Sequence, residues 1–291
     1  MNQRPVITPI DRSGNAPRAL AVAAAVANLA DADLNVIRVI RIPSERLLSH
    51  AQAIGLDGSV VSGHREAEAQ LAEAVAGVTV GPGHSITLDI VEGSDVASAI
   101  ISHARQHDPR AIVMATRAPK ALERAIVGSV ADRVVRESEN PVVLVPPRAG
   151  FLGGKNMEIS RVLVPQDGSS IAFRCLEFLI ELPRASDLEF VLIGVAPTEE
   201  RRRDAELELN RSVAWLRVRG VKSIEVVVAD ATDVASTIVG AGRRVFPDII
   251  AMSTRGASGL GRLVLGSVAE GVVRRSELPV LLLTPRMLAQ W

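Results

Sequence analysis

The stretch that decides the fold is Asp248–Pro285, DIIAMSTRGASGLGRLVLGSVAEGVVRRSELPVLLLTP. It opens with a short apolar run, Ile249–Met252, of the kind that forms a strand buried on both faces. A polar loop with three glycines follows, and glycine permits positive φ and a close approach of a ligand to the backbone. Ser267 and Glu270 then have the S-x-x-E spacing of a capping box. We therefore predict a helix from Ser267 to about Ser276, with Ser267 as its N-cap.

A strand, a glycine-rich loop and a helix N-terminus in succession favour an anion site. They offer free backbone N–H groups and the positive end of a helix dipole, most naturally to a phosphate chain. The loop is not G-x-x-x-x-G-K-[ST], because no Lys precedes a Ser or Thr, and no G-x-G-x-x-G opens the first helix of either half. Isolated glycine loops have many false positives, so the glycines could equally serve only to turn the chain.

The spacing of these residues resembles the signature of the universal stress protein family. The ATP-binding members of that family carry G-x-x-G, nine further residues and then G-[ST]. In this chain Ser253 stands at the first glycine position, Gly256 matches the second, and Gly266 with Ser267 matches the end. One of the three glycines is therefore missing. The residues after Ser267 also resemble the closing helix and strand of the family.

The chain contains the same pattern twice. Residues 5–13, PVITPIDRS, correspond to residues 161–169, RVLVPQDGS, and residues 114–147 correspond to residues 252–285. The offset is 156 residues between Asp11 and Asp167, but 138 between Gly128 and Gly266. The first half therefore holds about eighteen extra residues, which we place within Pro43–Gly63.

Short apolar runs alternate with helical patterns in each half, which is typical of βαβ units and a parallel sheet. In the first half the predicted strands are 6–8, 34–40, 86–91, 111–114 and 142–145, and the predicted helices are 17–29, 64–76, 95–107 and 129–138. In the second half the strands are 162–165, 188–195, 223–228, 248–252 and 280–284, and the helices are 170–182, 199–218, 234–244 and 267–276. The glycine-rich residues 148–156 are the predicted linker.

The resemblance implies an α/β fold with two tandem domains, residues 1–148 and 157–291. Each would hold a five-stranded parallel sheet of order 3-2-1-4-5 between helices. The resemblance also implies that the two final strands pair edge to edge, which makes the chain an intramolecular pseudo-dimer; a further homodimer stays open. In open α/β sheets, ligands bind beyond the carboxyl ends of the strands, where the strand order reverses. Asp11, Asp167 and both loops lie at that edge.

The resemblance further implies an adenine nucleotide site, for ATP with Mg²⁺, mainly in the second half. Its implied residues are Pro165, Gln166, Asp167, Val195, Met252, Ser253, Gly256, Gly266, Ser267 and Val268. Asp167 and Val195 would hold the nucleoside, and Asp167 could also form an Asx turn, which is compatible with that role. We expect no catalytic residue and no metal held by the protein alone, so any ATP hydrolysis would be slow.

The first half carries an altered copy of this site. The corresponding residues are Pro9, Asp11, Val39, Met114, Gly128, Ser129 and Val130. Ser129 and Asp132 have the S-x-x-D spacing of a cap, so Ser129 is the predicted N-cap of this helix. Ala115 and Ala118 replace both upstream glycines, and Pro119 follows directly. A Cβ at position 118 crowds the approach of a ligand, and Pro119 removes an N–H group. We therefore expect a weakened or lost site in this half. Because Ala is small and Asp11 is retained, a working site is the alternative.

The composition excludes several classes of partner. The 291 residues include 33 Lys and Arg against 33 Asp and Glu, so no global basic surface exists for nucleic acid or an anionic membrane. Aromatic residues make up 2%, too few for base-stacking platforms. No run reaches the roughly 18 apolar residues of a membrane span, and the N-terminus lacks a hydrophobic signal core. We expect a cytoplasmic protein. The single cysteine, Cys175, is expected to be buried in a helix.

All five histidines lie in the first half. His103 and His107 have i, i+4 spacing, but no third ligand is evident, so we expect two exposed histidines rather than a metal site. Two alternatives to an ATP-binding stress-response protein stay open. One is an interaction protein that binds no nucleotide, which Ser253 motivates. The other, less supported, is an enzyme of the related adenine-nucleotide α-hydrolase type.

Overall fold

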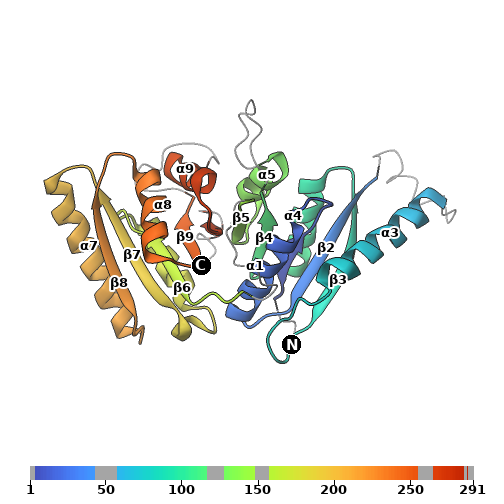
Figure 1. Ribbon diagram of the computed structural model, residues 1–291, viewed down its shortest axis with the longest axis horizontal. Coiled ribbons are helices and arrows are strands. Elements are labelled where there is room, and N and C mark those ends of the chain that lie inside the picture. The colour runs from blue at the N-terminus through green and yellow to red at the C-terminus, as the bar shows by residue number, and fades with distance from the viewer. Residues whose placement is uncertain are drawn as a thin grey trace.

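The computed structural model describes residues 4–42, 58–116, 128–147, 157–254, 265–284 and 287, with side chains from residue 63 onward in the second of these ranges. Figure 1 shows two α/β halves joined side by side. The predicted linker 148–156 lies outside the described residues, and so do Gly256, Ala118 and Pro119.

The predicted strands and helices are present in both halves. The first half contains β1 (Val6–Pro9), α1 (Ala16–Leu29), β2 (Leu34–Arg41), α3 (Gly58–Val75), β3 (Ile86–Gly93), α4 (Val96–His107), β4 (Ala111–Ala115), α5 (Ser129–Glu137) and β5 (Val142–Val145). The second contains β6 (Arg161–Pro165), α6 (Ser170–Ile180), the 3₁₀ turn η1 (Ala185–Asp187), β7 (Glu189–Ala196), α7 (Glu199–Val218), β8 (Ile224–Asp230), α8 (Val234–Val245), β9 (Ile249–Ser253), α9 (Ser267–Arg275) and β10 (Val280–Leu283). The largest boundary difference is at α3, which begins before the predicted residue 64.

The strands form a single sheet in the order β3-β2-β1-β4-β5-β10-β9-β6-β7-β8. Within each half the pairs are parallel and the order is 3-2-1-4-5, as predicted. The final strands β5 and β10 pair antiparallel, with Leu281 opposite Val143. The edge-to-edge pairing that the resemblance implied is therefore present, and it joins the two halves into one ten-stranded sheet.

Helices cover both faces of the sheet, which explains why the central strands β1, β4, β5, β6, β9 and β10 are almost continuously apolar, whereas the edge strands β3 and β8 are only partly buried. On β6, Val162 belongs to a core cluster with residues of α1 and α6, whereas Leu163 belongs to a second cluster with residues of α4, α5, α8 and α9. All strand residues from Val162 to Val164 are fully buried. Because side chains alternate between the faces, each strand contributes to two hydrophobic layers.

Helix α1 is buried along most of its length: it packs on β1 and β4 and against α3, and its residues share a core cluster with residues of α6. Its many alanines lose no side-chain rotamer freedom on burial and allow close packing. Cys175 of α6 is fully buried, and burial raises the pKa of its thiol to about 12. The prediction of a buried, structural cysteine is confirmed. Among the helices that the structure describes, none is long and apolar enough to cross a membrane.

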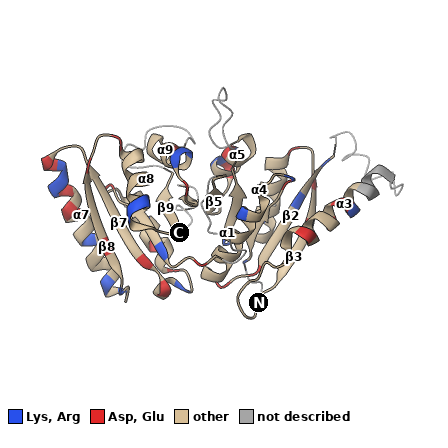
Figure 2. Cartoon of the chain, viewed as in Figure 1, with Lys and Arg blue, Asp and Glu red and all other residues tan. Residues whose placement is uncertain are grey.

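Helix α7 covers β7 and β8 and carries charges of both signs along its exposed side (Figure 2). Arg202 pairs with Glu206 at 3.2 Å and with Asp230 of β8 at 2.6 Å. Its buried side presents Leu209 and Leu216 to the sheet. The helix therefore lies directly on the second half-sheet, where its residues Ala205 and Leu209 lie close to Gly194 of β7.

The predicted N-cap of the last helix in each half is wrong by one residue. Helix α9 begins at Ser267 but its N-cap is Gly266, and α5 begins at Ser129 with Gly128 as its N-cap. No side chain closes either first turn. The glycine already turns the chain into the helix, so the serine becomes the first helical residue and cannot reach back as a cap.

Candidate functional site

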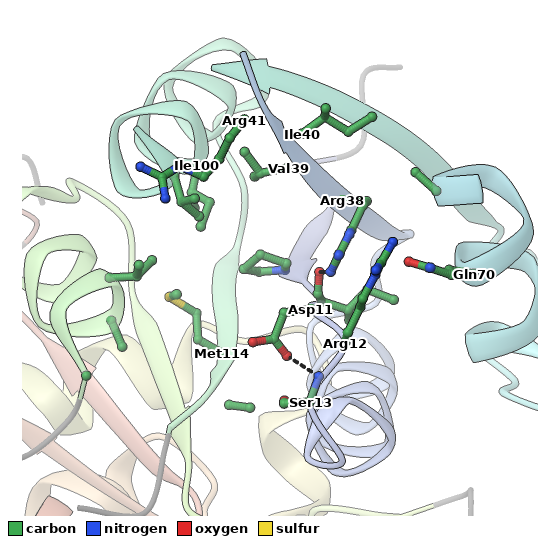
Figure 3. Close-up of a pocket in the computed structure, with 18 of the residues that line it drawn as sticks. Asp11, Arg12, Ser13, Arg38, Val39, Ile40, Arg41, Gln70, Ile100 and Met114 are labelled. Atoms are coloured by element: carbon green, nitrogen blue, oxygen red, sulfur yellow. Dashed lines mark hydrogen bonds between the residues drawn. The ribbon is translucent and has the colours of Figure 1, made fainter. Parts of the chain in front are cut away.

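A pocket of about 500 Å³ opens at the carboxyl edge of the first half-sheet (Figure 3). This volume is within the roughly 300–1,000 Å³ typical of small-molecule sites. The ends of β1, β2 and β4 form its floor, and residues of α3, α4 and the first turn of α5 form its walls. It therefore lies where the strand order reverses between β1 and β4.

The residues predicted for the first half come together in this pocket. Its lining includes Pro9, Asp11, Val39, Met114, Gly128, Ser129 and Val130. Asp11 is exposed, and its Oδ1 accepts the backbone N–H of Ser13 at 2.9 Å, which forms an Asx turn after β1. The turn holds the carboxylate at the rim of the pocket (Figure 3).

The first turn of α5 supplies the polar wall of the pocket. Gly128 has φ +85°, a left-handed conformation that favours glycine, and Ser129 beside it is exposed. The first N–H groups of a helix have no partner within the helix and lie at the positive end of its dipole. Val39 and Met114 provide apolar surface at the ends of β2 and β4. The pocket thus combines a helix N-terminus, with its free backbone N–H groups, and an apolar slot.

Sequence reasoning missed the arginines of this pocket, Arg12, Arg38 and Arg41. Nη2 of Arg12 pairs with Oε1 of Glu66 on α3 at 2.5 Å, and Nη1 of Arg38 donates to the carbonyl oxygen of Ile10 at 3.0 Å. Burial lowers the pKa of Arg38, and the nearby charge of Arg12 lowers it further. At the offset of 156 residues, the second half has Gly168, Gly194 and Pro197 at these three positions. Alignment of the two halves therefore shows, from the sequence alone, that only the first half has arginines at these positions.

In the second half, the predicted residues lie at the equivalent edge of the sheet. Asp167 repeats the turn of Asp11, accepting the N–H of Ser169 at 3.0 Å and its hydroxyl at 2.6 Å. The side-chain amide of Gln166 donates to the carbonyls of Pro165 and Ala172 at 3.1 Å, so it serves the start of α6.

The remaining predicted residues of the second half lie on its strand ends and on α9. Val195 is in β7, Met252 and Ser253 end β9, and Gly266, Ser267 and Val268 stand at the start of α9. Gly266 has an ordinary extended backbone with φ −62°, unlike Gly128, and its N–H donates to the carbonyl of Thr254 at 2.7 Å. Gly256, the other predicted phosphate contact, lies outside the described residues.

Helix α7 occupies the space that corresponds to the arginine side of the first pocket. A Cβ placed on Gly194 would meet Leu209 at 3.1 Å and Ala205 at 3.2 Å, and one on Gly168 would meet Cγ of Glu208 at 3.3 Å. No comparable space is left beside β7 for an arginine at position 194. The two halves thus have different walls at this edge.

The prediction of two exposed histidines on α4 is wrong for His103. This side chain is buried, and its Nε2 lies 2.8 Å from Oδ1 of Asn35, whose amide donates to Asp89 at 2.7 Å. A polar side chain can be buried here because its hydrogen bond to Asn35 of β2 replaces the hydrogen bonds it would make with water.

The sequence shows no third ligand beside the two histidines, but the structure brings one close: potential ligand atoms of Asp89, His103 and His107 lie within 4.8 Å of one another. The imidazole rings of the two histidines stack with centroids 4.1 Å apart and an interplanar angle of 32°. His103 Nε2 is already bonded to Asn35, so this cluster forms a polar contact between α4 and the sheet.

Comparison with known proteins decides the family. Residues 3–146 and residues 158–284 each match the profile of the Universal stress protein family. The chain belongs to the universal stress protein family. A universal stress protein of Methanocaldococcus jannaschii is 26% identical over 144 residues, which cover 44% of this chain and 83% of that protein.

One solved universal stress protein shares the fold over the whole chain. The crystal structure of one from Archaeoglobus fulgidus DSM 4304 covers 96% of this chain and 98% of its own, with a TM-score of 0.68 at 21% identity. A universal stress protein solved with cAMP covers 43% of this chain and 97% of its own at 22% identity. Its TM-score of 0.37 is too low for a comparison of the two sites.

Proposed function

We propose that this universal stress protein binds adenine nucleotides at the carboxyl edge of its half-sheets, as a regulatory module. One observation carries the proposal: the described residues that the family signature singled out in the first half line one pocket of about 500 Å³. Residues 9–11, 39, 114 and 128–130 are far apart in the sequence. Their assembly around one cavity at the topological switch point is what a nucleotide site requires.

The chemistry of the pocket matches the three parts of a nucleotide. The first turn of α5, from Gly128, offers N–H groups and a positive dipole end to phosphate oxygens. The exposed carboxylate of Asp11 can accept hydrogen bonds from ribose hydroxyls. Val39 and Met114 offer apolar contact to a base. In this proposal Mg²⁺ is held chiefly by the phosphate chain and water, as is usual for this ion.

The second half is proposed as a further site, with the family signature as its main support. Asp167 and Val195 would hold the nucleoside, and Gly256 with the first N–H groups of α9 would hold the phosphates. The sequence predicts this half as the main site because it retains Gly256, whereas the cavity described above lies in the first half. We therefore treat occupancy of both halves as the working proposal.

Calorimetric titration of the full chain with ATP, with and without Mg²⁺, tests the proposal through its stoichiometry. We expect two ATP per chain. Asp11→Ala should weaken binding to the first half and Asp167→Ala to the second, each by about tenfold, since a hydrogen bond to a charged group is worth about 1.5–3 kcal/mol. One site that only Asp167→Ala affects would refute the first-half site. No binding by folded protein would favour the interaction-protein alternative.

A further inference from the structure

The first-half pocket has a cationic wall that the family signature does not explain. Arg12 lies within the Asx turn after β1, between Asp11 and Ser13, and Arg38 lies on β2. Their side chains lie next to each other near α3 (Figure 3). Arg12 uses one nitrogen for Glu66 and Arg38 one for the carbonyl of Ile10. Because a guanidinium carries five N–H donors, both retain donors for a ligand.

The charge of Arg38 is only partly compensated. Within the part of the chain that the structure describes, no carboxylate forms an ion pair with it, and its guanidinium is half-buried. The pKa of Arg38 is lowered first by burial and then by Arg12, against smaller opposing contributions from Asp11 and Glu66. A half-buried cation beside another cation is stabilised by an anion that approaches both.

The second half provides an internal comparison, because it cannot offer this wall. Gly168 and Gly194 replace the two arginines. The Cγ of Glu208 lies where a side chain at position 168 would project, and Leu209 closes on position 194. The second half therefore has no arginine at these two positions, and the charged group beside Gly168 is the carboxylate of Glu208, which pairs with Arg211 at 2.6 Å.

The chain length before each helix explains the difference. Ala67 and Leu71 of α3 correspond to Ala205 and Leu209 of α7, so the helices present the same residue types. Residues 42–57 separate β2 from α3, whereas only Pro197 and Thr198 separate β7 from α7. The short connection holds α7 against β7, while the longer one allows α3 to leave room for Arg38.

We propose that the first-half pocket binds an adenine nucleotide that carries a second phosphate group, and that Arg12 and Arg38 bind this second phosphate. The first turn of α5 takes the 5′-phosphate, and both walls belong to the same cavity. This inference rests on the proposed nucleotide function and names the ligand class of its first-half site. Two arginines are suited to it, since they bind phosphate oxygens through several N–H groups at once.

The test compares AMP with adenosine 3′,5′-bisphosphate and its 2′,5′ isomer, each titrated calorimetrically into the full chain. Both isomers are used so that the result does not depend on which ribose hydroxyl carries the phosphate. We expect at least one bisphosphate to bind about tenfold or more tightly than AMP at low salt, with a smaller preference at high salt because the ions are screened. The double variant Arg12→Gln and Arg38→Gln should bring the ratio of affinities close to one.

Controls separate a specific role from general charge and folding effects. Arg18→Gln removes an exposed arginine on α1 that bonds only Asn15 among the described residues, and it should leave the ratio unchanged. Thermal melting checks that each variant folds, and the single variant Arg38→Lys, which keeps the charge, should retain part of the preference.

The outcomes distinguish this inference from the proposed function. Equal affinity of the parent chain for AMP and both bisphosphates would overturn the inference and leave nucleotide binding standing. A preference that persists in the Arg12→Gln and Arg38→Gln chain would also overturn it. If neither AMP nor a bisphosphate binds, the proposed function fails and the inference fails with it.

Discussion

The two halves share one fold but differ at the edge where a ligand would bind. In the first half, α3 leaves a pocket that holds Arg12 and Arg38. In the second half, α7 packs on β7 so closely that a Cβ on Gly194 would lie only 3.1 Å from Leu209 and 3.2 Å from Ala205. The difference teaches that a longer connection after one strand can change the chemistry of a site while the sheet stays the same.

The halves also differ beside α4 and α8. In the first half Asn35, His103 and Asp89 form a hydrogen-bonded polar contact between helix and sheet. The equivalent residues of the second half are Val191, Ala241 and Val227. The same position is thus polar and titratable in one half and apolar in the other, which predicts a different response to acid.

Two single variants that place the residue of one half in the other test the space beside the second strand of each half. Of the variants considered, Gly194→Arg should have the largest effect on stability. Gly194→Arg would force a long charged side chain against Leu209 and Ala205, and we expect a loss of about 3 kcal/mol or more through overpacking and a buried charge. The reciprocal Arg38→Gly should cost much less, because that side chain faces a cavity. Urea denaturation measures both. Equal losses would show that the two helices pack alike.

Substitutions of the N-cap glycines of α5 and α9 should have the next largest effect on stability. Gly128→Ala places a Cβ on a residue with φ +85°, at a cost of about 1–2 kcal/mol, whereas Gly266→Ala acts at φ −62° and carries no such strain. If nucleotide binds in the first half, Gly128→Ala should weaken that site by about tenfold. Calorimetry and thermal melting measure the two effects. A stable Gly128→Ala chain with unchanged affinity would contradict the described backbone at α5.

The last two helices of each half contact each other differently, and variants at these contacts should change the free energy of unfolding by a smaller amount. Gly271 lets α9 approach α8, since an added Cβ would lie 2.6 Å from Cβ of Ala235. Overpacking there outweighs the gain in helix propensity, so Gly271→Ala should cost about 1 kcal/mol. At the equivalent position Arg133 reaches Asp95 at 2.7 Å, Glu137 at 2.9 Å and Ser98 at 2.8 Å.

Arg133→Ala is the matched variant for Gly271→Ala. Because Asp95 and Ser98 are exposed and the side chains of Arg133 and Glu137 are only partly buried, we expect the melting temperature of the variant to stay within about 2 °C of the parent value. A larger fall for Arg133→Ala than for Gly271→Ala would reverse the comparison between the two helix pairs. Circular dichroism melts of both chains decide it.

Acid should act on the first half through His103. Its pKa is lowered from 6.5, chiefly by burial and then by His107, against an opposing contribution from Asp89. The folded state therefore keeps the imidazole neutral while the unfolded state takes up a proton near pH 6.5. Stability is fully present above that pH and is lost as the pH falls towards the folded pKa, by at most about 1.4 kcal/mol per pH unit.

His103→Ala gives the first half the residue of the second, Ala241. Its stability should depend less on pH between about 6.5 and 5 than that of the parent, although the chain loses a buried hydrogen bond. Urea denaturation across this pH range measures both quantities. A pH dependence identical to the parent's would exclude His103 as the titrating group.

Local sequence patterns were enough to predict the helices and strands, their order along the chain and the family. Apolar runs and helical periodicity are local signals, and the repeat with its change of offset placed the extra residues between β2 and α3. The rule that ligands bind where the strand order reverses then predicts that Asp11, Met114 and Gly128 lie at one edge of the sheet. These inferences needed only the direction of each strand and the place where it ends.

Only the tertiary structure decided which side chains share a pocket or a core. Arg12 and Arg38 face a cavity because α3 leaves space at the carboxyl end of β2, and His103 is buried because Asn35 on β2 offers it a partner. The serines predicted as caps became first helical residues because Gly128 and Gly266 already turn the chain. Each outcome depends on the distance between elements far apart in the sequence, which no local pattern records.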